Sequence, residues 1–267
     1  MCIIICFIIE KVGVYVTSKI KEETILGVRI AVTNMNQVVN YIYENIKDLS
    51  GKYICVSNVH TTVMSYEDEN YKKIQNAAVL RLPDGGPLSS VQRKRGHSEA
   101  ERVTGPDLMK RMFEESDTHH LKHFFYGSTP ETLETLEKKL RETYPKLDIV
   151  GKYSPPFRSL TEKEDREIIK MINDSKADIV WIGLGAPKQE KWMFEHNDKV
   201  SGLMIGVGAG FDYHAGNIKR APKWMQKCNL EWLYRLLQDP KRLFKRYFKT
   251  NLKFIKLVNK ENKNEKL

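Results

Sequence analysis

Asp84 stands at a point in the chain where a carboxylate could act as a general base. It follows an apolar run, residues 79–82, and precedes two glycines in Pro83-Asp84-Gly85-Gly86. At the carboxyl end of a strand, beside residues with no side chain to block a substrate, a carboxylate can accept a proton from a hydroxyl. The same residue could instead cap the next helix or form an Asx turn. Asp84 is therefore a candidate base with a structural alternative.

Basic residues that could bind an anion follow Asp84. Arg93, Lys94 and Arg95 form a run, and Arg102 leads into Thr104-Gly105-Pro106-Asp107, which opens a helical pattern. Guanidinium groups bind phosphate oxygens in a bidentate manner, so these residues could neutralise a diphosphate. They could equally form a solvated face. Asp107 suits the first turn of a helix, where a carboxylate offsets the helix dipole.

A third group of polar residues follows a strand directly, in Gly185-Ala186-Pro187-Lys188-Gln189-Glu190. Free N–H groups at a helix start attract phosphate, and Lys188 could contact the same anion. Gln189 could hydrogen-bond a sugar or a base. Glu190 could bind substrate too, or it could simply offset the helix dipole.

Motifs for a metal or a bound cofactor are missing from the sequence. His119, His120 and His123 include an i, i+4 pair, but no cysteine or carboxylate cluster accompanies them, so we expect no zinc site there. The chain has no Asp-x-Asp, Walker A, Gly-x-Gly-x-x-Gly or HExxH motif. We therefore expect neither a metal nor a cofactor.

The elements that must position these residues alternate along the chain. Short apolar runs at 28–32, 53–57, 79–82, 122–126, 148–150, 179–183 and 203–207 are separated by helical patterns at 34–47, 106–115, 130–143, 162–173 and 187–195. Such alternation predicts an α/β fold, Rossmann-like, with a mostly parallel sheet and helices on both faces. The glycine-rich or polar loops after the strands would then form one ligand crevice. Any one loop could be only a tight turn, but together they favour a nucleotide-like ligand.

The net positive charge of the chain lies in its last 51 residues. Residues 217–267 hold 15 Lys/Arg and 4 Asp/Glu, whereas residues 1–216 are almost neutral. A neutral body with a basic tail indicates that the tail meets an anionic partner, either a phospholipid surface or a nucleic acid. We divide the chain into an N-terminal extension (1–27), a core (28–216) and a basic helical appendage (217–267).

The basic tail also has a helical pattern. Asp239-Pro240 is a good helix start. One side of the helix after it is basic, with Lys241, Arg242, Lys245, Arg246, Lys249, Lys253, Lys256 and Lys260. The opposite side holds Leu243, Phe244, Tyr247, Phe248, Phe254, Ile255 and Val258, with Leu252 and Leu257 at the edges. The pattern is typical of a helix in a membrane interface, or of a surface helix whose apolar side packs on the body.

Other features bear on the cellular compartment. The four cysteines form no CxxC pair, which favours a reducing cytosol. The apolar run Cys2–Ile9 is too short to span a bilayer and lacks the features of a signal peptide. Any membrane contact should therefore be peripheral.

Several motifs in one order resemble the WecG/TagA/CpsF glycosyltransferase family over roughly residues 28–250. They are Leu82-Pro83-Asp84-Gly85-Gly86, Arg102-Val103-Thr104-Gly105-Pro106-Asp107-Leu108-Met109, Phe125-Tyr126-Gly127-Ser128, Gly183-Leu184-Gly185-Ala186-Pro187-Lys188-Gln189-Glu190-Lys191-Trp192, Gly206-Val207-Gly208-Ala209-Gly210-Phe211-Asp212, Ala215-Gly216-Asn217-Ile218-Lys219-Arg220-Ala221-Pro222 and Leu230-Glu231-Trp232-Leu233-Tyr234-Arg235-Leu236. Such a set is more specific than any one motif.

The resemblance implies a bacterial, cytoplasmic enzyme, peripheral on the inner face of the plasma membrane. It would transfer an N-acetylmannosamine-type sugar from UDP to a polyprenyl-diphosphate-linked sugar, with inversion and without an essential metal. The products feed teichoic acid, enterobacterial common antigen or capsule synthesis. A homo-oligomer is possible, and no nucleic acid is expected as a partner.

The resemblance also assigns residue roles. Asp84 matches the proposed base, and Arg102 and Gln189 match other active-site positions. Arg235 and Arg242 match appendage arginines, and Lys245 or Arg246 supplies a third cation. The remaining substrate-binding candidates are Asn58, His60, Lys188, Glu190, Gly208 and Asp212.

The match has departures. Val56 replaces a threonine of the teichoic acid branch, for which Ser57 or Thr61 could compensate, and His60 brings an imidazole to the crevice. These departures leave the donor and acceptor open. Two rival functions also stay open: a nucleic-acid-binding protein that uses the tail, and a non-catalytic protein that binds UDP-sugars or lipid intermediates.

Overall fold

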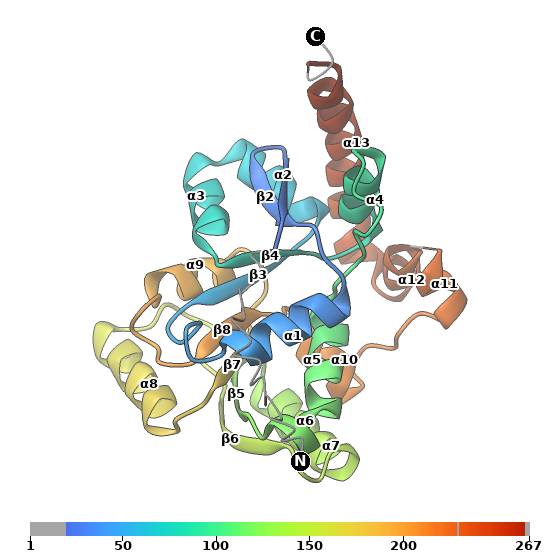
Figure 1. Cartoon of the computed structure of the whole chain (residues 1–267). Coiled ribbons are helices and arrows are strands. Elements are labelled where there is room, and N and C mark those ends of the chain that lie inside the picture. Colours follow the sequence, from blue (N-terminus) through green and yellow to red (C-terminus); the bar gives the residue numbers. More distant parts are fainter. Residues whose placement is uncertain (1–19, 229, 265–267) are drawn as a thin grey trace, which may run out of the picture.

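A six-stranded, wholly parallel sheet forms the centre of the computed structural model, which describes residues 20–228 and 230–264 (Figure 1). Its strands run in the order β4-β3-β8-β7-β5-β6. They are β3 (Tyr53–Ser57), β4 (Leu80–Pro83), β5 (Lys122–Gly127), β6 (Asp148–Tyr153), β7 (Ile179–Gly183) and β8 (Leu203–Gly206). The predicted α/β class with a parallel sheet is confirmed.

The sheet is buried because helices cover both of its faces. Every residue of β3, β4 and β8 is buried, as expected for parallel strands with apolar residues on both sides. One face packs Phe125, Trp181 and Ile205 against helices α1, α5, α7 and α10. The other face packs Phe124, Tyr126 and Met204 against α8 and α9. The layers therefore match the architecture that the sequence predicted.

Helices follow or precede most strands, and several of them begin at a side chain that accepts from the free backbone N–H groups. They are α1 (Met35–Asn45), α2 (Val59–Glu67), α3 (Glu69–Ala77), α4 (Gly86–Lys94), α5 (Gly105–Glu114), α6 (Ser116–His119), α7 (Pro130–Thr143), α8 (Glu162–Asp174), α9 (Lys188–Glu195), α10 (Gly210–Ala215), α11 (Lys223–Lys227), α12 (Glu231–Gln238) and α13 (Pro240–Asn264). Asn34, Asn58 and Thr161 form capping boxes, and Thr104 and Thr129 cap helices that carry proline in their first turn. The helices expected from the sequence all form, with small shifts at their ends.

The run at residues 28–32 does not join the parallel sheet, contrary to our expectation. Val28–Ala31 forms β2, which pairs antiparallel with β1 (Glu22–Ile25) in a separate hairpin. Leu26 and Gly27 both have positive φ (52° and 81°), as a two-residue hairpin turn requires. The predicted boundary after residue 27 therefore falls in the turn of a hairpin. The apolar run Cys2–Ile9 lies outside the described residues.

A buried arginine holds this hairpin against β4. The side chain of Arg81 is 2% exposed, and its guanidinium pairs with Glu22. It also donates to the Arg29 carbonyl at 2.5 Å and to the Ala78 carbonyl. The hairpin therefore attaches to the edge of the sheet through charge and backbone hydrogen bonds.

The long helix α13 docks by its second half and projects away from the sheet (Figure 1). Phe254 and Val258 are buried among hairpin residues and residues of α2 and α4. Arg95 links the hairpin to α13, since it pairs with Glu23 of the hairpin (2.9 Å) and with Glu261 of α13 (2.7 Å). Arg95 thus holds the fold together, and our suggestion that it neutralises a diphosphate is wrong.

Replacing Arg81 by methionine should lower the free energy of unfolding by about 3 kcal/mol, because Glu22 and two carbonyls lose their buried donor. Urea denaturation of the purified protein measures this change. The matched control is Arg141→Gln, which breaks an exposed pair with Glu137 and should change stability by less than about 1 kcal/mol. Equal effects of the two substitutions would contradict the role given to Arg81.

Candidate active site

Asp84 and Asn58 meet where β4 and β3 end. The Asp84 N–H donates to the Ser57 carbonyl at 2.7 Å, which fixes one loop beside the other. The Asn58 carboxamide oxygen accepts from the N–H groups of His60 (3.0 Å) and Thr61 (3.2 Å) and so caps α2. The Asn58 side chain also hydrogen-bonds the Asp84 carboxylate. The parallel sheet therefore places both predicted site residues together at one edge of the sheet, where the expected crevice would lie.

Burial and neighbouring charges shift the pKa of the Asp84 carboxyl. Burial raises its pKa from 3.8 to about 6, against the opposing effects of Arg102, the Asn58 hydrogen bond and Arg235. The charge of Glu231 raises the pKa further. A carboxyl with a pKa near 6 is ionised at neutral pH, yet it is a stronger base than an ordinary aspartate.

The buried Gln189 side chain hydrogen-bonds two loops, one after β7 and one after β8. Its side-chain oxygen accepts from the Gly185 N–H (3.1 Å) after β7 and from the Gly208 N–H (3.0 Å) after β8, and its nitrogen donates to Glu190 (3.1 Å). A Cβ on Gly206 would lie 3.0 Å from the Gln189 side-chain nitrogen, so glycine leaves room for this amide. Gln189 is only 4% exposed and in this structure it positions loops. Its direct contact with a sugar stays a prediction.

A buried polar chain continues from Glu190 to the end of β3. Glu190 is fully buried, which raises its pKa, and it hydrogen-bonds Tyr71 of α3. The Tyr71 hydroxyl accepts from the Gln75 amide (3.0 Å), and the Ser57 hydroxyl donates to Gln75 (2.8 Å). Sequence reasoning missed Tyr71 and Gln75; their i, i+4 spacing on one helix was the available signal.

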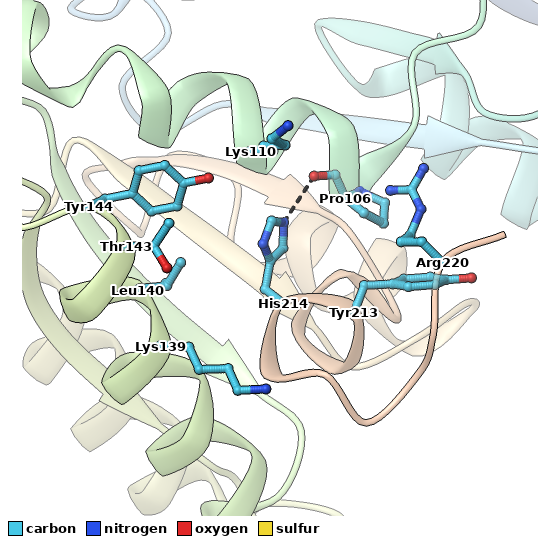
Figure 2. Close-up of a pocket in the computed structure, with 9 residues that line it drawn as sticks. All are labelled: Pro106, Lys110, Lys139, Leu140, Thr143, Tyr144, Tyr213, His214 and Arg220. Carbon is cyan, nitrogen blue, oxygen red and sulfur yellow. Dashed lines mark hydrogen bonds between the residues drawn. The ribbon is translucent and has the colours of Figure 1, made fainter. Parts of the chain in front are cut away.

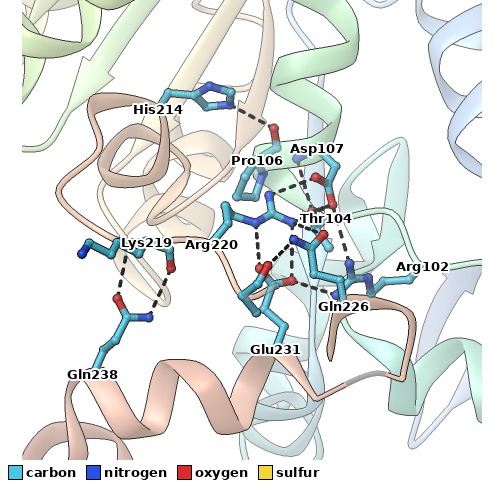
Figure 3. A network of polar contacts seen from close by, with 11 residues as sticks. Arg102, Thr104, Pro106, Asp107, His214, Lys219, Arg220, Gln226, Glu231 and Gln238 are labelled. Carbon is cyan, nitrogen blue, oxygen red and sulfur yellow. Dashed lines mark hydrogen bonds and ion pairs between the residues drawn. The ribbon is translucent and has the colours of Figure 1, made fainter. Parts of the chain in front are cut away.

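Arginines and carboxylates alternate in a network that includes Arg102 and Glu231 (Figure 3), two residues whose charges act on Asp84. Glu231 of α12 accepts from Arg102 at 2.9 Å and pairs with Arg220 at 2.7 Å. Arg220 also donates two hydrogen bonds to Asp107, at 2.9 and 3.2 Å. Asp107, which the sequence offered only as a helix-dipole residue, thus belongs to this network. Arg220 and Glu231 lie in motifs that we quoted, but spacing alone gave them no role.

The appendage reaches the same network through a second arginine. The guanidinium carbons of Arg220 and Arg235 lie 5.3 and 5.7 Å from the centre of the Tyr213 ring. The charge of Arg235 also acts on Asp84. Residues 242, 245 and 246 belong to the first turns of α13, and their side chains lie outside the description. Of the four predicted cations, only Arg235 is therefore placed, near Asp84.

The other candidates lie in the loops after strands or in the first turns of helices. Lys188 is exposed at the first position of α9, and Gly208 has a positive φ (53°) in the loop after β8. Asp212 lies in the first turn of α10 and accepts from Asn217 at 3.2 Å. His60 is partly exposed at the start of α2. Their contact with substrate stays a prediction.

Ser57 and Thr61, the possible substitutes for a threonine at position 56, are both 1% exposed and bond to Gln75 and Asn58. The histidines do not converge, since His123 is buried and accepts from Trp181 whereas His119 stacks on Tyr43. Within residues 20–228 and 230–264, no three or more His, Cys, Asp or Glu side chains are grouped to hold a metal.

A cavity of about 280 Å³ opens beside the arginine network, between α5, α7 and α10 (Figure 2). It shares Arg220 and Tyr213 with the network, and Lys110 and Lys139 also line it. Both lysines have partners, because Lys139 donates to the Ala215 carbonyl and Lys110 pairs with Glu114. None of the site residues predicted from the sequence lines this cavity.

Replacing Gln189 by alanine should loosen both glycine loops, because the N–H groups of Gly185 and Gly208 lose their acceptor. We expect faster hydrogen exchange at these two amides and a loss of about 1–3 kcal/mol in the free energy of unfolding. Lys191→Ala, on the exposed side of the same helix, is the control and should change neither quantity. Unchanged exchange in Gln189→Ala would show that the amide does not hold the loops.

Similar proteins of known name cover nearly the whole chain. One is the N-acetylglucosaminyldiphosphoundecaprenol N-acetyl-β-D-mannosaminyltransferase of Bacillus subtilis (strain 168), 29% identical over 249 residues, 92% of this chain and 94% of the relative. A protein of the same name from Staphylococcus aureus (strain MW2) is 30% identical over 222 residues, 82% of this chain and 85% of the relative. The similarity therefore extends through the body and the appendage.

The family comparison covers the same range. The model of the glycosyl transferase WecG/TagA/CpsF family matches residues 23–267. That range includes the hairpin, the parallel sheet with its crevice and the whole of α11, α12 and α13. It confirms the resemblance drawn from the motifs. The chain belongs to the WecG/TagA/CpsF family and is a glycosyltransferase.

Proposed function

We propose that this glycosyltransferase moves an N-acetylmannosamine-type sugar from a UDP-linked donor to a polyprenyl-diphosphate-linked N-acetylglucosamine, with inversion. The observation that carries the proposal is Asp84, a carboxyl with a pKa of about 6 directly after β4, an edge strand of the sheet, and near Arg102 and Arg235. The names of the similar proteins from B. subtilis and S. aureus support this donor sugar and this acceptor.

The proposed reaction is a single displacement. The acceptor hydroxyl gives its proton to Asp84 while its oxygen forms a bond to the anomeric carbon. The bond from that carbon to the diphosphate oxygen breaks on the opposite face, and UDP leaves with the electron pair. The protonated Asp84 then returns its proton to water. General-base assistance of this kind is most effective when the pKa of the base lies near the working pH.

Positive groups at the crevice would stabilise the departing diphosphate. Arg102 and Arg235 lie near Asp84, and the exposed Lys188 stands at the start of α9 with the Gly185 loop before it. Fixed donors at the place where negative charge develops lower the barrier without further reorganisation. We expect these groups to serve where other glycosyltransferases use a metal ion.

The appendage is suited to meet the acceptor at a membrane. Phe244, Phe248, Leu252 and Ile255 form an exposed stripe along α13, between 47% and 61% exposed. Exposed lysines run beside it, namely Lys241, Lys249, Lys256 and Lys260. An apolar stripe beside lysines favours an anionic lipid surface over a nucleic acid, which offers phosphates but few apolar partners along its backbone.

The apolar residues of α13 are divided between a buried and an exposed side of the helix. Leu243, Phe254 and Val258 are buried, whereas the stripe that begins at Phe244 faces outward. None of the described helices is long and apolar enough to cross a bilayer. We propose a peripheral attachment in which α13 lies on the membrane surface.

Replacing Asp84 by asparagine should lower the rate of UDP release by about 10²–10⁴-fold, because the acceptor hydroxyl loses its base. The assay uses UDP-N-acetylmannosamine and a short-chain polyprenyl-diphosphate N-acetylglucosamine. In the native enzyme, kcat/KM should fall as the pH drops below about 6, since the proton that Asp84 must accept is then already present. Near-native turnover by the variant would remove Asp84 from this role.

The same variant carries its own control for folding. The folded-state pKa of Asp84 is raised, so its carboxyl stabilises the fold below pH 3.8 and loses that contribution as the pH rises through about 6. At pH 7.5 the ionised carboxylate therefore costs stability, and Asp84→Asn should melt at a higher temperature than the native protein. A lower melting temperature would show that the variant loses activity because its fold is damaged.

Replacing both Phe244 and Phe248 by serine should weaken binding to vesicles of phosphatidylglycerol at least about 10-fold, because each ring contributes on the order of 1.5–3 kcal/mol when buried. Sedimentation with the vesicles measures the binding. Phe157→Ser is the matched control, because Phe157 is an 83% exposed phenylalanine on the body. If all variants bind as the native protein does, the stripe is not the membrane contact.

A further inference from the structure

The carboxylate of Glu231 enters the crevice from the appendage. Glu231 is the first residue of α12, and its side chain is only 16% exposed. One oxygen accepts from Arg102 at 2.9 Å, and the other lies 2.7 Å from the Arg220 guanidinium (Figure 3). Glu231 therefore links the appendage, which also holds Arg220, to Arg102 of the body.

The proposed reaction makes two opposing demands on this region. A diphosphate needs arginines close by, as Arg102 and Arg235 are. A general base needs a pKa near the working pH, and positive charge close to a carboxylate lowers its pKa. Without a compensating negative charge, the arginines that suit the diphosphate would make Asp84 a poorer base.

We propose that Glu231 is a positioning residue of the reaction, which holds Arg102 and Arg220 in place and balances their charge so that Asp84 remains an effective base. The proposal rests on the proposed function and names a residue for which neither the sequence motifs nor the family suggested a role in the reaction. Glu231 can pair with Arg102 only when α12 lies against the body. The proposal therefore makes the reaction depend on the docking of the appendage.

The charges around Asp84 support this balance. Arg102 comes from the segment before α5, Arg235 and Glu231 from α12, and the Asn58 amide from the end of β3. Asp107 of α5 contributes to the charge balance indirectly, through its two hydrogen bonds to Arg220. Three arginines therefore face three carboxylates when Asp84 is ionised. Neutralising Glu231 leaves Asp84 and Asp107 with an excess of positive charge.

A second acidic residue of the appendage provides a control that distinguishes the electrostatic role of Glu231 from a role in docking. Glu261, near the end of α13, pairs with Arg95 at 2.7 Å and accepts from the Leu26 N–H at 2.9 Å. It therefore helps to attach the appendage to the hairpin, but it is absent from the groups that act on Asp84. Glu261→Gln is the matched control for Glu231→Gln, because each removes one appendage carboxylate that pairs with a body arginine.

The experiment measures UDP release against pH from 5 to 9 with the full-length native protein, Glu231→Gln and Glu261→Gln. We expect Glu231→Gln to move the acid limb of kcat/KM to lower pH by roughly one unit, and to lower the plateau several-fold because the base is weaker. Glu261→Gln should leave the limb in place. If the limb of Glu231→Gln coincides with that of the native protein, the proposal is overturned.

Glu231→Gln leaves Arg220 with one partner fewer. If this variant does not fold, a second comparison still tests the proposal. Arg220→Gln should raise the acid limb, because Glu231, whose charge acts on Asp84, loses one of the two arginines that offset it, and adding Glu231→Gln should bring the limb down again. Equal limbs in the Arg220→Gln protein and the double variant would overturn the proposal. Failure of the proposed function is distinguishable, since the native protein would then release no UDP from this donor and acceptor.

Discussion

Parallel pairing is the constraint on which the rest of this structure depends. In a parallel sheet every strand ends at the same edge, and a helix must carry the chain back to begin the next strand. Asp84, Asn58 and the loops at Gly185 and Gly208 come from four different strands of this sheet. They meet only because β4, β3, β7 and β8 are neighbours that run in one direction. The helices that return the chain also bury the apolar faces of the strands.

Buried polar contacts keep that edge in a fixed shape. Gln189 binds the backbone of two loops, and the chain through Glu190, Tyr71 and Gln75 connects it to the end of β3. A buried amide or carboxyl without partners would be costly, so these side chains hold one arrangement of the loops. These buried side chains therefore fix the positions of the loops without being exposed themselves. This support leaves the substrate side free for Asp84 and the basic residues.

The appendage completes the crevice by charge as much as by shape. Its α12 contributes Glu231, which pairs with Arg102 of the body and with Arg220, and Arg235, whose charge acts on Asp84. Farther along, α13 packs Phe254 and Val258 on the hairpin while the stripe from Phe244 to Ile255 faces outward. In our proposal a helix attached to the body on one side and to lipid on the other keeps the crevice at the membrane surface, where a lipid-linked acceptor lies.

The sequence by itself determined the α/β class, most element bounds, the helix start at Pro240 and the family, because alternation, capping residues and motifs are local signals. It also selected Asp84, Asn58, Arg102 and Gln189, since each follows a strand or opens a helix. Only the tertiary structure decided that residues 28–31 pair with residues 22–25, that Arg95 joins the hairpin to α13 and that Glu231 meets Arg102. Arg102 and Glu231 are 129 positions apart, and no local pattern encodes such a pair. Ion pairs and burial depend on which surfaces meet, and those surfaces exist only after the helices have packed on the sheet.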